Sequence, residues 1–299
     1  MQRIFLVLLI LTMASSVYGR GKGESGAAFL KIGQGARALA MGEAYVAVAD
    51  DPYASCWNPA GLAMINAPQF GGMYGRWFQD IATQHLTFAR PAGNMVLGAG
   101  ITMLQVKNIE EWKDENTYSG NFNASDMAII LSGARKVNTK ANVGANLKLI
   151  STKIKNESAS AWALDLGGLY HPSSVKGLSI GVSLQNLGTS LKFKKEKDPL
   201  PFNIKIGCAY RLFEERLIVA GDLNSPNDAD INIRLGTEYT YPIDQNKLVA
   251  IRAGYREGDD SGKLTVGCGL QIGNFQFDYA YLSFGNLDST HRVSLIKRF

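Results

Sequence analysis

The sequence has few of the residues on which most enzymes and metal sites depend. Its 299 residues include only three cysteines and three histidines. Cys56, Cys208 and Cys268 form no C-x-x-C pair and have no histidine near them in the sequence, so neither a disulfide framework nor a zinc site is predicted. None of the histidines lies in a nucleophile motif. We therefore expect no catalytic residue, no metal and no cofactor.

Charge of one sign and long apolar runs are also scarce. Lysine and arginine total 31 against 26 acidic residues, and the densest basic run, Lys192–Lys197, is typical of a solvated loop. A nucleic-acid partner is therefore not supported. Beyond residue 19, no apolar stretch approaches the roughly 18 residues of a membrane-spanning helix. The mature chain is thus either soluble and secreted, or inserted in a membrane as strands.

The N-terminus has the pattern of an export signal. Arg3 precedes the apolar run Ile4–Met13, and small and polar residues lead to Val17-Tyr18-Gly19, which fits a signal-peptidase site. We expect residues 1–19 to be removed as a signal peptide.

From Gln69 onward, apolar residues alternate with small or polar ones, as in strands that have one apolar face. In Leu178–Gln185, for example, Leu178, Ile180 and Val182 share the apolar face. About fourteen such segments are near the roughly 9–11 residues needed to cross a membrane. They lie near 69–78, 83–90, 94–106, 126–136, 141–153, 159–171, 177–187, 201–212, 216–224, 230–241, 246–256, 262–272, 274–284 and 290–299.

An even number of strands with short turns on one side and longer loops on the other is typical of a bacterial membrane barrel. Arg90–Asn94 and Arg135–Ala141 are short, whereas Val106–Ser125 and Leu187–Pro201 are long and polar and are predicted as outer loops. The lumen is predicted to be polar and cross-braced by charge pairs. The residues predicted to face it include Asn142, Asn146, Lys148, Asp165, Lys205, Arg211, Asp222, Arg234, Glu238, Arg252, Arg256, Gln271 and Asp278.

Ahead of these strands stands a segment rich in glycine and alanine, Gly33–Leu62. Small residues allow close backbone packing, so this segment is predicted to fill a confined space, as a plug inside a barrel would. Asp51-Pro52 predicts a short helix through Tyr53–Trp57, and Asn58-Pro59 repeats the same capping pattern.

The run GARALAMGEAYVAVADDPYASCWNPAGLA, residues 35–63, resembles the N-terminal signature of the PorV/PorQ family, whose members are related to the FadL fatty-acid transporters. The resemblance implies an N-terminal hatch (20–65) inside a 14-stranded barrel (66–299) in the outer membrane of a diderm bacterium. Glu43 departs from the signature, because relatives more often carry a small residue there. The hatch motif comprises Arg37, Gly42, Asp50, Asp51, Trp57, Asn58, Pro59 and Ala60.

The C-terminal end, with Val293, Leu295 and Phe299 on one strand face, resembles the recognition signal of outer-membrane barrels. This resemblance implies contact with the barrel-assembly machinery and with outer-membrane lipid.

Two functions follow from the family resemblance. The first is that of a non-enzymatic accessory of type IX-like secretion, which binds secreted cargo or partner proteins at the cell surface, with Val106–Ser125 and its Trp112 as the best candidate surface. The alternative is FadL-like transport of long-chain fatty acids or other hydrophobic small molecules through a hatch-gated barrel. That alternative predicts ligand contacts at Leu39, Met41, Tyr45 and Trp57. A soluble secreted β-protein is a third interpretation, which extraction without detergent would reveal.

Overall fold

The computed structural model describes residues 23–76, 81–114, 116–194, 196–257, 263–283 and 289–299. The predicted signal peptide, residues 1–19, lies outside the described residues and stays a prediction.

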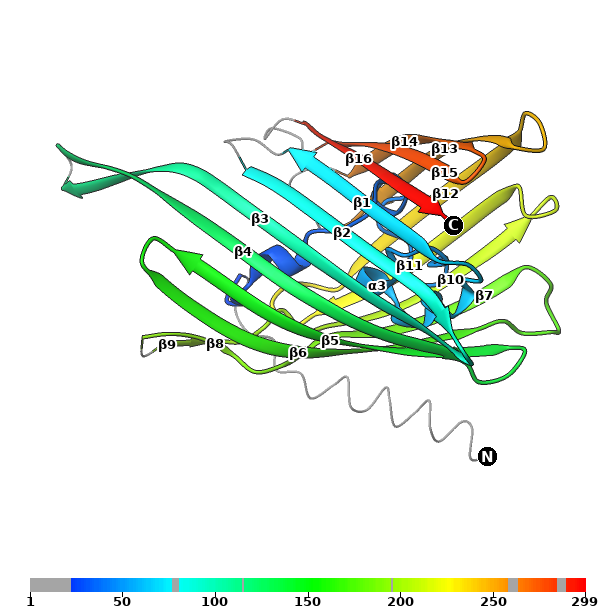
Figure 1. Cartoon of the computed structure of the whole chain (residues 1–299), viewed down its shortest axis with the longest axis horizontal. Helices are drawn as coiled ribbons and strands as arrows, with labels where there is room; N and C mark the ends of the chain where they lie inside the picture. The colour runs from blue at the N-terminus through cyan, green and yellow to red at the C-terminus, as the bar shows by residue number, and fades with distance from the viewer. Residues whose placement is uncertain (1–22, 77–80, 115, 195, 258–262, 284–288) are drawn as a thin grey trace.

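Fourteen of the strands in the described part of the chain form one closed antiparallel barrel (Figure 1). They are β1 (Gln69–Arg76), β2 (Ile81–Ala92), β3 (Met95–Asp114), β4 (Thr117–Lys136), β5 (Ala141–Ile154), β6 (Glu157–Tyr170), β7 (Leu178–Gly188), β10 (Asn203–Leu212), β11 (Leu217–Pro226), β12 (Asn232–Pro242), β13 (Lys247–Arg256), β14 (Leu264–Ile272), β15 (Phe275–Ser283) and β16 (Ser289–Arg298). The first and last strands close the barrel, with Gln69 opposite Arg298 and Arg76 opposite His291. Closure pairs the edges that an open sheet would expose. Each strand corresponds to one of the fourteen predicted segments, and the prediction of a 14-stranded barrel with an N-terminal hatch is confirmed.

The two faces of the strands differ as the alternation predicts. On β7, Ile180 and Val182 are exposed on the outer face, whereas Ser179 and Ser183 are buried toward the lumen. An apolar outer face is what a lipid environment requires, because lipid cannot solvate polar side chains.

The two ends of the barrel differ in their connections. The turns 93–94, 137–140 and 273–274 are short and lie at the end where the C-terminus is found. At the opposite end β3 and β4 extend well beyond the wall (Figure 1). Because bacterial barrels have short periplasmic turns and longer extracellular loops, we call these the inner and outer ends.

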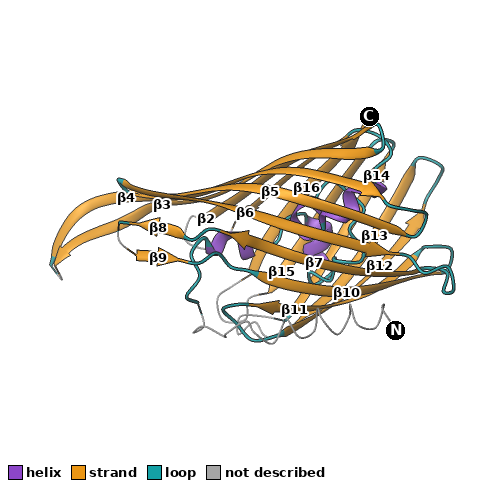
Figure 2. Ribbon diagram, turned by 90° about the horizontal axis from the view of Figure 1, so that it is seen from below, coloured by secondary structure: helices purple, strands orange, loops and turns teal. Residues whose placement is uncertain are grey.

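Within the described part of the chain, four short helices fill part of the lumen (Figure 2). They are η1 (Ala28–Lys31), α2 (Ala36–Ala40), α3 (Ala54–Trp57) and η2 (Pro59–Met64). The hatch, as we use the term below, is the described segment 23–65 that carries them. No helix in the described residues is long and apolar enough to span a membrane.

The sequence prediction was wrong about 106–125, which is not a loop. β3 and β4 continue as a paired hairpin through Asp114 and Thr117, with Ile109 opposite Phe122 and Trp112 opposite Tyr118. Such cross-strand pairs stabilise a sheet. The alternation is missing from the sequence because both faces of this hairpin lie in water, so neither face needs to be apolar.

The other predicted outer loop, 187–201, also contains strands. β8 (Leu191–Phe193) and β9 (Glu196–Asp198) pair with each other as a small two-stranded flap. The flap is attached through buried Leu191, which belongs to the same apolar cluster as Phe29 of η1. The flap therefore packs on the outermost part of the hatch.

Candidate functional site: the hatch and its two chambers

The hatch backbone lies directly against the barrel wall at several glycines. A Cβ added to Gly254 would lie 2.0 Å from the Gly42 nitrogen, and one added to Gly236 would lie 2.2 Å from the Met41 oxygen. At Gly144 the nearest hatch atom would be the Pro59 carbonyl carbon, 2.4 Å away. Side chains at these wall positions would need the space that the hatch main chain occupies.

Asn58 joins two parts of the hatch to the wall. Its Nδ2 donates to the carbonyl oxygens of Val46, at 2.8 Å, and of Gly168 on β6, at 3.1 Å. Its Oδ1 accepts the N–H of Ala60 at 3.2 Å and caps η2 in front of Pro59. The predicted capping role of Asn58 is therefore accompanied by a second contact that ties the hatch to the barrel.

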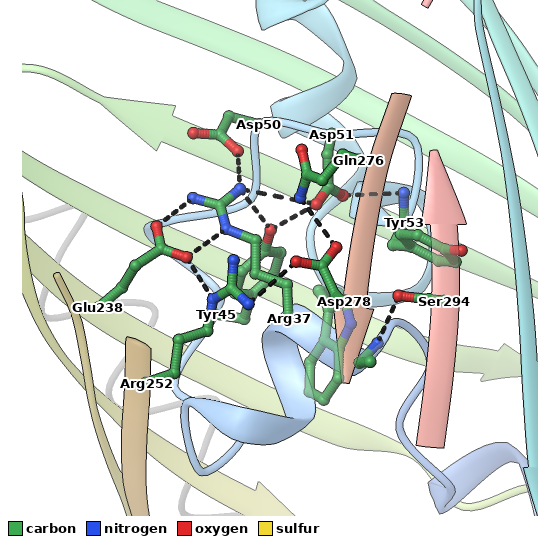
Figure 3. Close-up of polar contacts among 12 residues, drawn as sticks. Arg37, Tyr45, Asp50, Asp51, Tyr53, Glu238, Arg252, Gln276, Asp278 and Ser294 are labelled. Carbon is green, nitrogen blue, oxygen red and sulfur yellow. Dashed lines mark hydrogen bonds and ion pairs between the residues drawn. The ribbon is translucent and has the colours of Figure 1, made fainter. Parts of the chain in front are cut away.

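Arg37 is the centre of an ion-pair network between the hatch and β12, β13 and β15 (Figure 3). Its guanidinium bonds both oxygens of Glu238 on β12, at 2.8 and 2.9 Å, and Asp50 of the hatch at 2.6 Å. Arg252 on β13 shares Glu238, at 2.5 Å, and reaches Asp278 on β15 at 2.9 Å. Because Arg37 and Glu238 are bound on two atoms each, the pair fixes orientation as well as distance.

A second carboxylate fixes the neighbouring part of the hatch. Asp222 of β11 accepts the backbone N–H groups of Tyr45, at 2.8 Å, and of Val46, at 2.9 Å. Glu43, the departure from the family signature, adopts a φ of 67° and is bound by Arg256 at 3.2 Å and by Arg234 at 3.7 Å. Burial alone would raise the pKa of Glu43, but the two arginines, Arg256 first, outweigh it and hold this pKa below its ordinary value.

Asp51 is the hatch carboxyl with the most unusual titration. Its Oδ2 accepts the Tyr45 hydroxyl at 2.7 Å, and its Oδ1 accepts the Tyr53 N–H at 3.0 Å. Burial raises the pKa of Asp51 to about 6, although the charge of Arg37 opposes the rise. A buried carboxyl of this kind changes protonation close to neutral pH.

The hatch is therefore expected to be held less firmly as the pH rises from 5 to 7.5. The pKa of Asp51 is higher in the seated hatch than in a released one, so its contribution is complete below about pH 4 and is lost as the pH passes through about 6. The free energy that Asp51 contributes to holding the hatch in the barrel should be on the order of 2 kcal/mol. Hydrogen exchange of the hatch amides at both pH values measures it. The Asp51→Asn variant keeps the size of the side chain and one of its two acceptor oxygens but cannot titrate, so it should show a smaller pH dependence; an equal dependence would contradict the assignment.

The hatch divides the lumen into two chambers. The outer chamber has a volume of about 600 Å³. It lies on the side of the hatch that faces the outer end of the barrel, and both hatch and wall residues line it. Its lining includes Leu30, Ile32, Leu39, Glu43, Trp57, Leu104, Ile130, Lys148, Lys205, Asn224, Arg234, Arg256 and Leu282. The inner chamber, of about 410 Å³, is lined by Arg37, Asp50, Asp51, Glu238, Arg252 and Asp278 among others.

The residues predicted from the sequence lie in three places. Leu39 and Trp57 line the outer chamber, as a ligand contact would require. Met41 and Tyr45 are fully buried in the apolar core of the hatch and line neither chamber. The predicted assembly signal lies on β16 and just beyond it, where Val293 and Phe299 are exposed. The sequence did not predict the contacts of the wall glycines with the hatch. These contacts depend on the register between strands, which the sequence of a single strand does not determine.

Outside the lumen, the most prominent feature is the end of the β3–β4 hairpin. β3 pairs with β2 only as far as Val106, and β4 pairs with β5 only from Ala124. Beyond these residues, the Lys155 N–H donates to the Asn123 carbonyl oxygen at 3.2 Å, and the rest of the described hairpin has no neighbouring strand other than its own partner strand. Trp112 and Tyr118 stand on it with 53% of their surface exposed, in an edge-to-face contact of 5.5 Å between ring centroids.

Comparisons with solved structures agree with the architecture. The chain is similar to the Pseudomonas putida toluene transporter TodX, at 13% identity over 89% of this chain and 99% of that one, with a TM-score of 0.64. It is also similar to the CymD monoaromatic hydrocarbon channel, at 14% identity over 89% and 98%, TM-score 0.65. A Pseudomonas aeruginosa FadL homologue matches at 12% identity over 87% and 96%, TM-score 0.55. These likenesses establish the fold.

The family is established by sequence. None of the curated proteins matches this chain. The model of the family described as "Type IX secretion system protein PorV" matches residues 22–225, which is more than half of the 299 residues. The chain therefore belongs to the PorV family of type IX secretion system proteins, and it is an outer-membrane β-barrel without enzymatic activity.

Proposed function

We propose that this barrel serves secretion by docking a secreted protein on the outer part of the β3–β4 hairpin. The observation that carries the proposal is the pair Trp112 and Tyr118, exposed on a hairpin whose two edges have no strand beside them among the described residues. A few residues contribute most of the binding energy in a protein interface, and tryptophan and tyrosine are enriched among them. Unpaired strand edges offer backbone N–H and C=O groups to an extended segment of a partner.

The hairpin is also held in place from the side. Lys155, in the turn between β5 and β6, forms an ion pair with Glu111 on the hairpin. Trp112 Nε1 donates to Glu110 Oε2 at 3.0 Å, which restricts the indole ring. A surface whose side chains are ordered before binding loses less entropy when a partner docks.

Transport of hydrophobic molecules, the alternative function, has less support. The hydrocarbon channels and this chain share only 13–14% identity, so the activities of those channels do not transfer with the fold. The hatch is bound to the wall through the Arg37 and Asp222 contacts on one side and through Asn58 on the other. Passage through the lumen would require breaking these contacts, whereas docking on the hairpin requires none to break.

Removing both aromatic rings is expected to impair secretion. In cells that carry Trp112→Ala and Tyr118→Ala together, the amount of type IX cargo in the medium should fall about tenfold, as the loss of two interface anchors predicts. Quantitative mass spectrometry of the medium and of the cell fractions measures the effect. The matched control is Trp162→Ala, which removes an equally exposed indole from the lipid-facing wall. Normal secretion with the double variant, at normal barrel abundance, would refute docking at the hairpin.

A further inference from the structure

Two arginines stand on the lipid-facing side of the wall near its inner end. Arg90 on β2 continues the outward row that contains Phe88, and Arg135 on β4 continues the outward row that contains Leu131. Both arginines are exposed. A charged residue on the lipid face of a barrel costs least near the interface, where its long side chain can reach the head groups. The two guanidinium groups are therefore expected at the level of the phosphates of the inner leaflet.

The two arginines lie on either side of β3. Arg90 is opposite Leu97 of β3, and Leu97 is opposite Gly133 of β4, two residues before Arg135. Strand spacing and rise place the two Cα atoms roughly 12 Å apart. Because the strands slope across the wall (Figure 1), the offset of two residues brings both arginines to a similar depth in the membrane. Their side chains can thus converge on one head group.

Neither guanidinium group is used within the protein. Among the described residues, the side chains of Arg90 and Arg135 form no hydrogen bond and no ion pair. Lys297 on β16 is different, because its ammonium lies 5.6 Å from the ring centre of Phe275 and 4.6 Å from that of Phe299. Arg90 and Arg135 are therefore available to a negatively charged group from outside the chain.

The neighbouring turns contain no carboxylate that would compete for these arginines. The inner-end turns that follow β2, β4 and β6 contain no aspartate or glutamate, and the last two carry Lys140 and Lys176. The turns after β10 and β12 are different, since they include Glu214, Glu215 and Asp244. Positive charge is thus concentrated on one side of the inner end. Such a concentration at a membrane surface favours anionic lipids over zwitterionic ones.

Apolar side chains continue from the two arginines toward the middle of the wall. Phe88, Leu97 and Leu131 are exposed on this face. They are placed to contact the acyl chains of a lipid whose phosphate binds Arg90 and Arg135. An acidic protein in the periplasm would reach the arginines but not these side chains, which face the bilayer. The combination therefore favours a lipid over a protein partner.

We propose that the inner part of the face formed by β2, β3 and β4 binds an anionic phospholipid of the inner leaflet, with its phosphate at Arg90 and Arg135. Arginine suits this role because its planar guanidinium binds phosphate oxygens on two atoms. The site is outside the barrel, at the opposite end of β3 and β4 from the proposed docking surface. The two proposals are therefore independent, and either can fail without the other.

Native mass spectrometry of the purified full chain in detergent micelles measures this binding. The probes are phosphatidylglycerol and phosphatidylethanolamine with the same acyl chains, and glycerol 3-phosphate, which has no chains. We expect the first phosphatidylglycerol to bind about tenfold more tightly than phosphatidylethanolamine, because two cations act on a net negative charge. Equal affinity for the two lipids would overturn the proposal. Glycerol 3-phosphate in excess should not displace the lipid, and displacement would show a phosphate site without a lipid contact, which would also overturn it.

Variants identify the residues. Arg90→Gln combined with Arg135→Gln should abolish the preference for phosphatidylglycerol, whereas Arg90→Lys combined with Arg135→Lys should keep part of it, because the charge remains but the planar fork is lost. The matched control combines Lys107→Gln with Lys153→Gln, which removes two exposed cations from the outer parts of β3 and β5 and should leave the preference intact. Gel migration that changes only on boiling shows that each variant is a folded barrel. An unchanged preference in the double glutamine variant of the arginines, or an equal loss in the control, would overturn the site.

Discussion

Replacing Arg37 with methionine is expected to unseat the hatch and to open the barrel to ions. The change keeps an unbranched apolar side chain but removes the guanidinium that binds Glu238 and Asp50. Glu238 is almost completely buried and, among the described residues, would keep only Arg252 as an ion-pair partner. Breaking one side of a buried ion pair costs about 3–5 kcal/mol. Single-channel conductance in planar bilayers should rise, and hydrogen exchange over 36–50 should accelerate while the strands stay protected.

Lys31 provides the matched control for this effect. It also connects the hatch to the wall, through an ion pair with Asp228, but its side chain is 39% exposed. The partner Asp228 is only 1% exposed, but water can replace the partly exposed Lys31 ammonium beside it, so we expect this pair to contribute about 1 kcal/mol. Lys31→Met should therefore leave conductance close to that of the parent protein. If Arg37→Met behaved like Lys31→Met, the network around Glu238 would not be what holds the hatch.

Replacing Gly254 with valine is expected to have an effect of similar size by a different physical route. The new Cβ would lie 2.0 Å from the Gly42 nitrogen and 2.4 Å from the Met41 carbonyl carbon. Both atoms are backbone, so the clash cannot be relieved by turning a side chain. Valine itself suits a strand, and the barrel should still assemble. We expect the barrel to fold, so that its migration on a gel changes only after boiling. We expect the hatch to be displaced, which should raise the conductance and allow protease cleavage within the hatch.

A glycine on the outer surface separates this clash from a general intolerance of valine. At Gly133 on β4, the nearest atom to an added Cβ is the end of the Met95 side chain, 3.5 Å away. Gly133→Val should assemble and keep the hatch seated. A Gly254→Val protein with parental conductance and an uncleaved hatch would show that the hatch does not press on the wall at this point.

The barrel itself could be predicted from the sequence because each strand carries its own signal. In 177–187, the alternation of leucine, isoleucine and valine with serine and glycine identifies the faces, and β7 has its side chains oriented accordingly. The charges predicted to brace the lumen do pair, as Arg252 with Glu238 and Lys148 with Asp165 show. Charged side chains in a filled lumen are buried, and burying a charge without a partner is unfavourable, so such side chains are expected to form ion pairs.

The contacts of the hatch were less predictable, since they depend on register and closure. The sequence identifies Arg37 and Asn58 as parts of a family motif, but it does not show that Arg37 binds Glu238, 201 positions away in the sequence. The same holds for Gly254 and Gly236, which are ordinary strand glycines until the barrel closes around the hatch. The hairpin beyond Val106 was missed for another reason, because a strand with water on both faces has no apolar period to detect.

The secretion role itself is tested most directly by deleting the gene for this chain and measuring the proteins released by the cells. Quantitative mass spectrometry should compare the medium, the periplasm and the cell surface of the deletion strain with those of a strain complemented by the parent chain. The account predicts that type IX cargo disappears from the medium and accumulates inside, that complementation restores its release, and that uptake of fatty acids and aromatic hydrocarbons is unchanged. Normal release of cargo combined with a loss of hydrophobic uptake would contradict the account and favour the transport alternative.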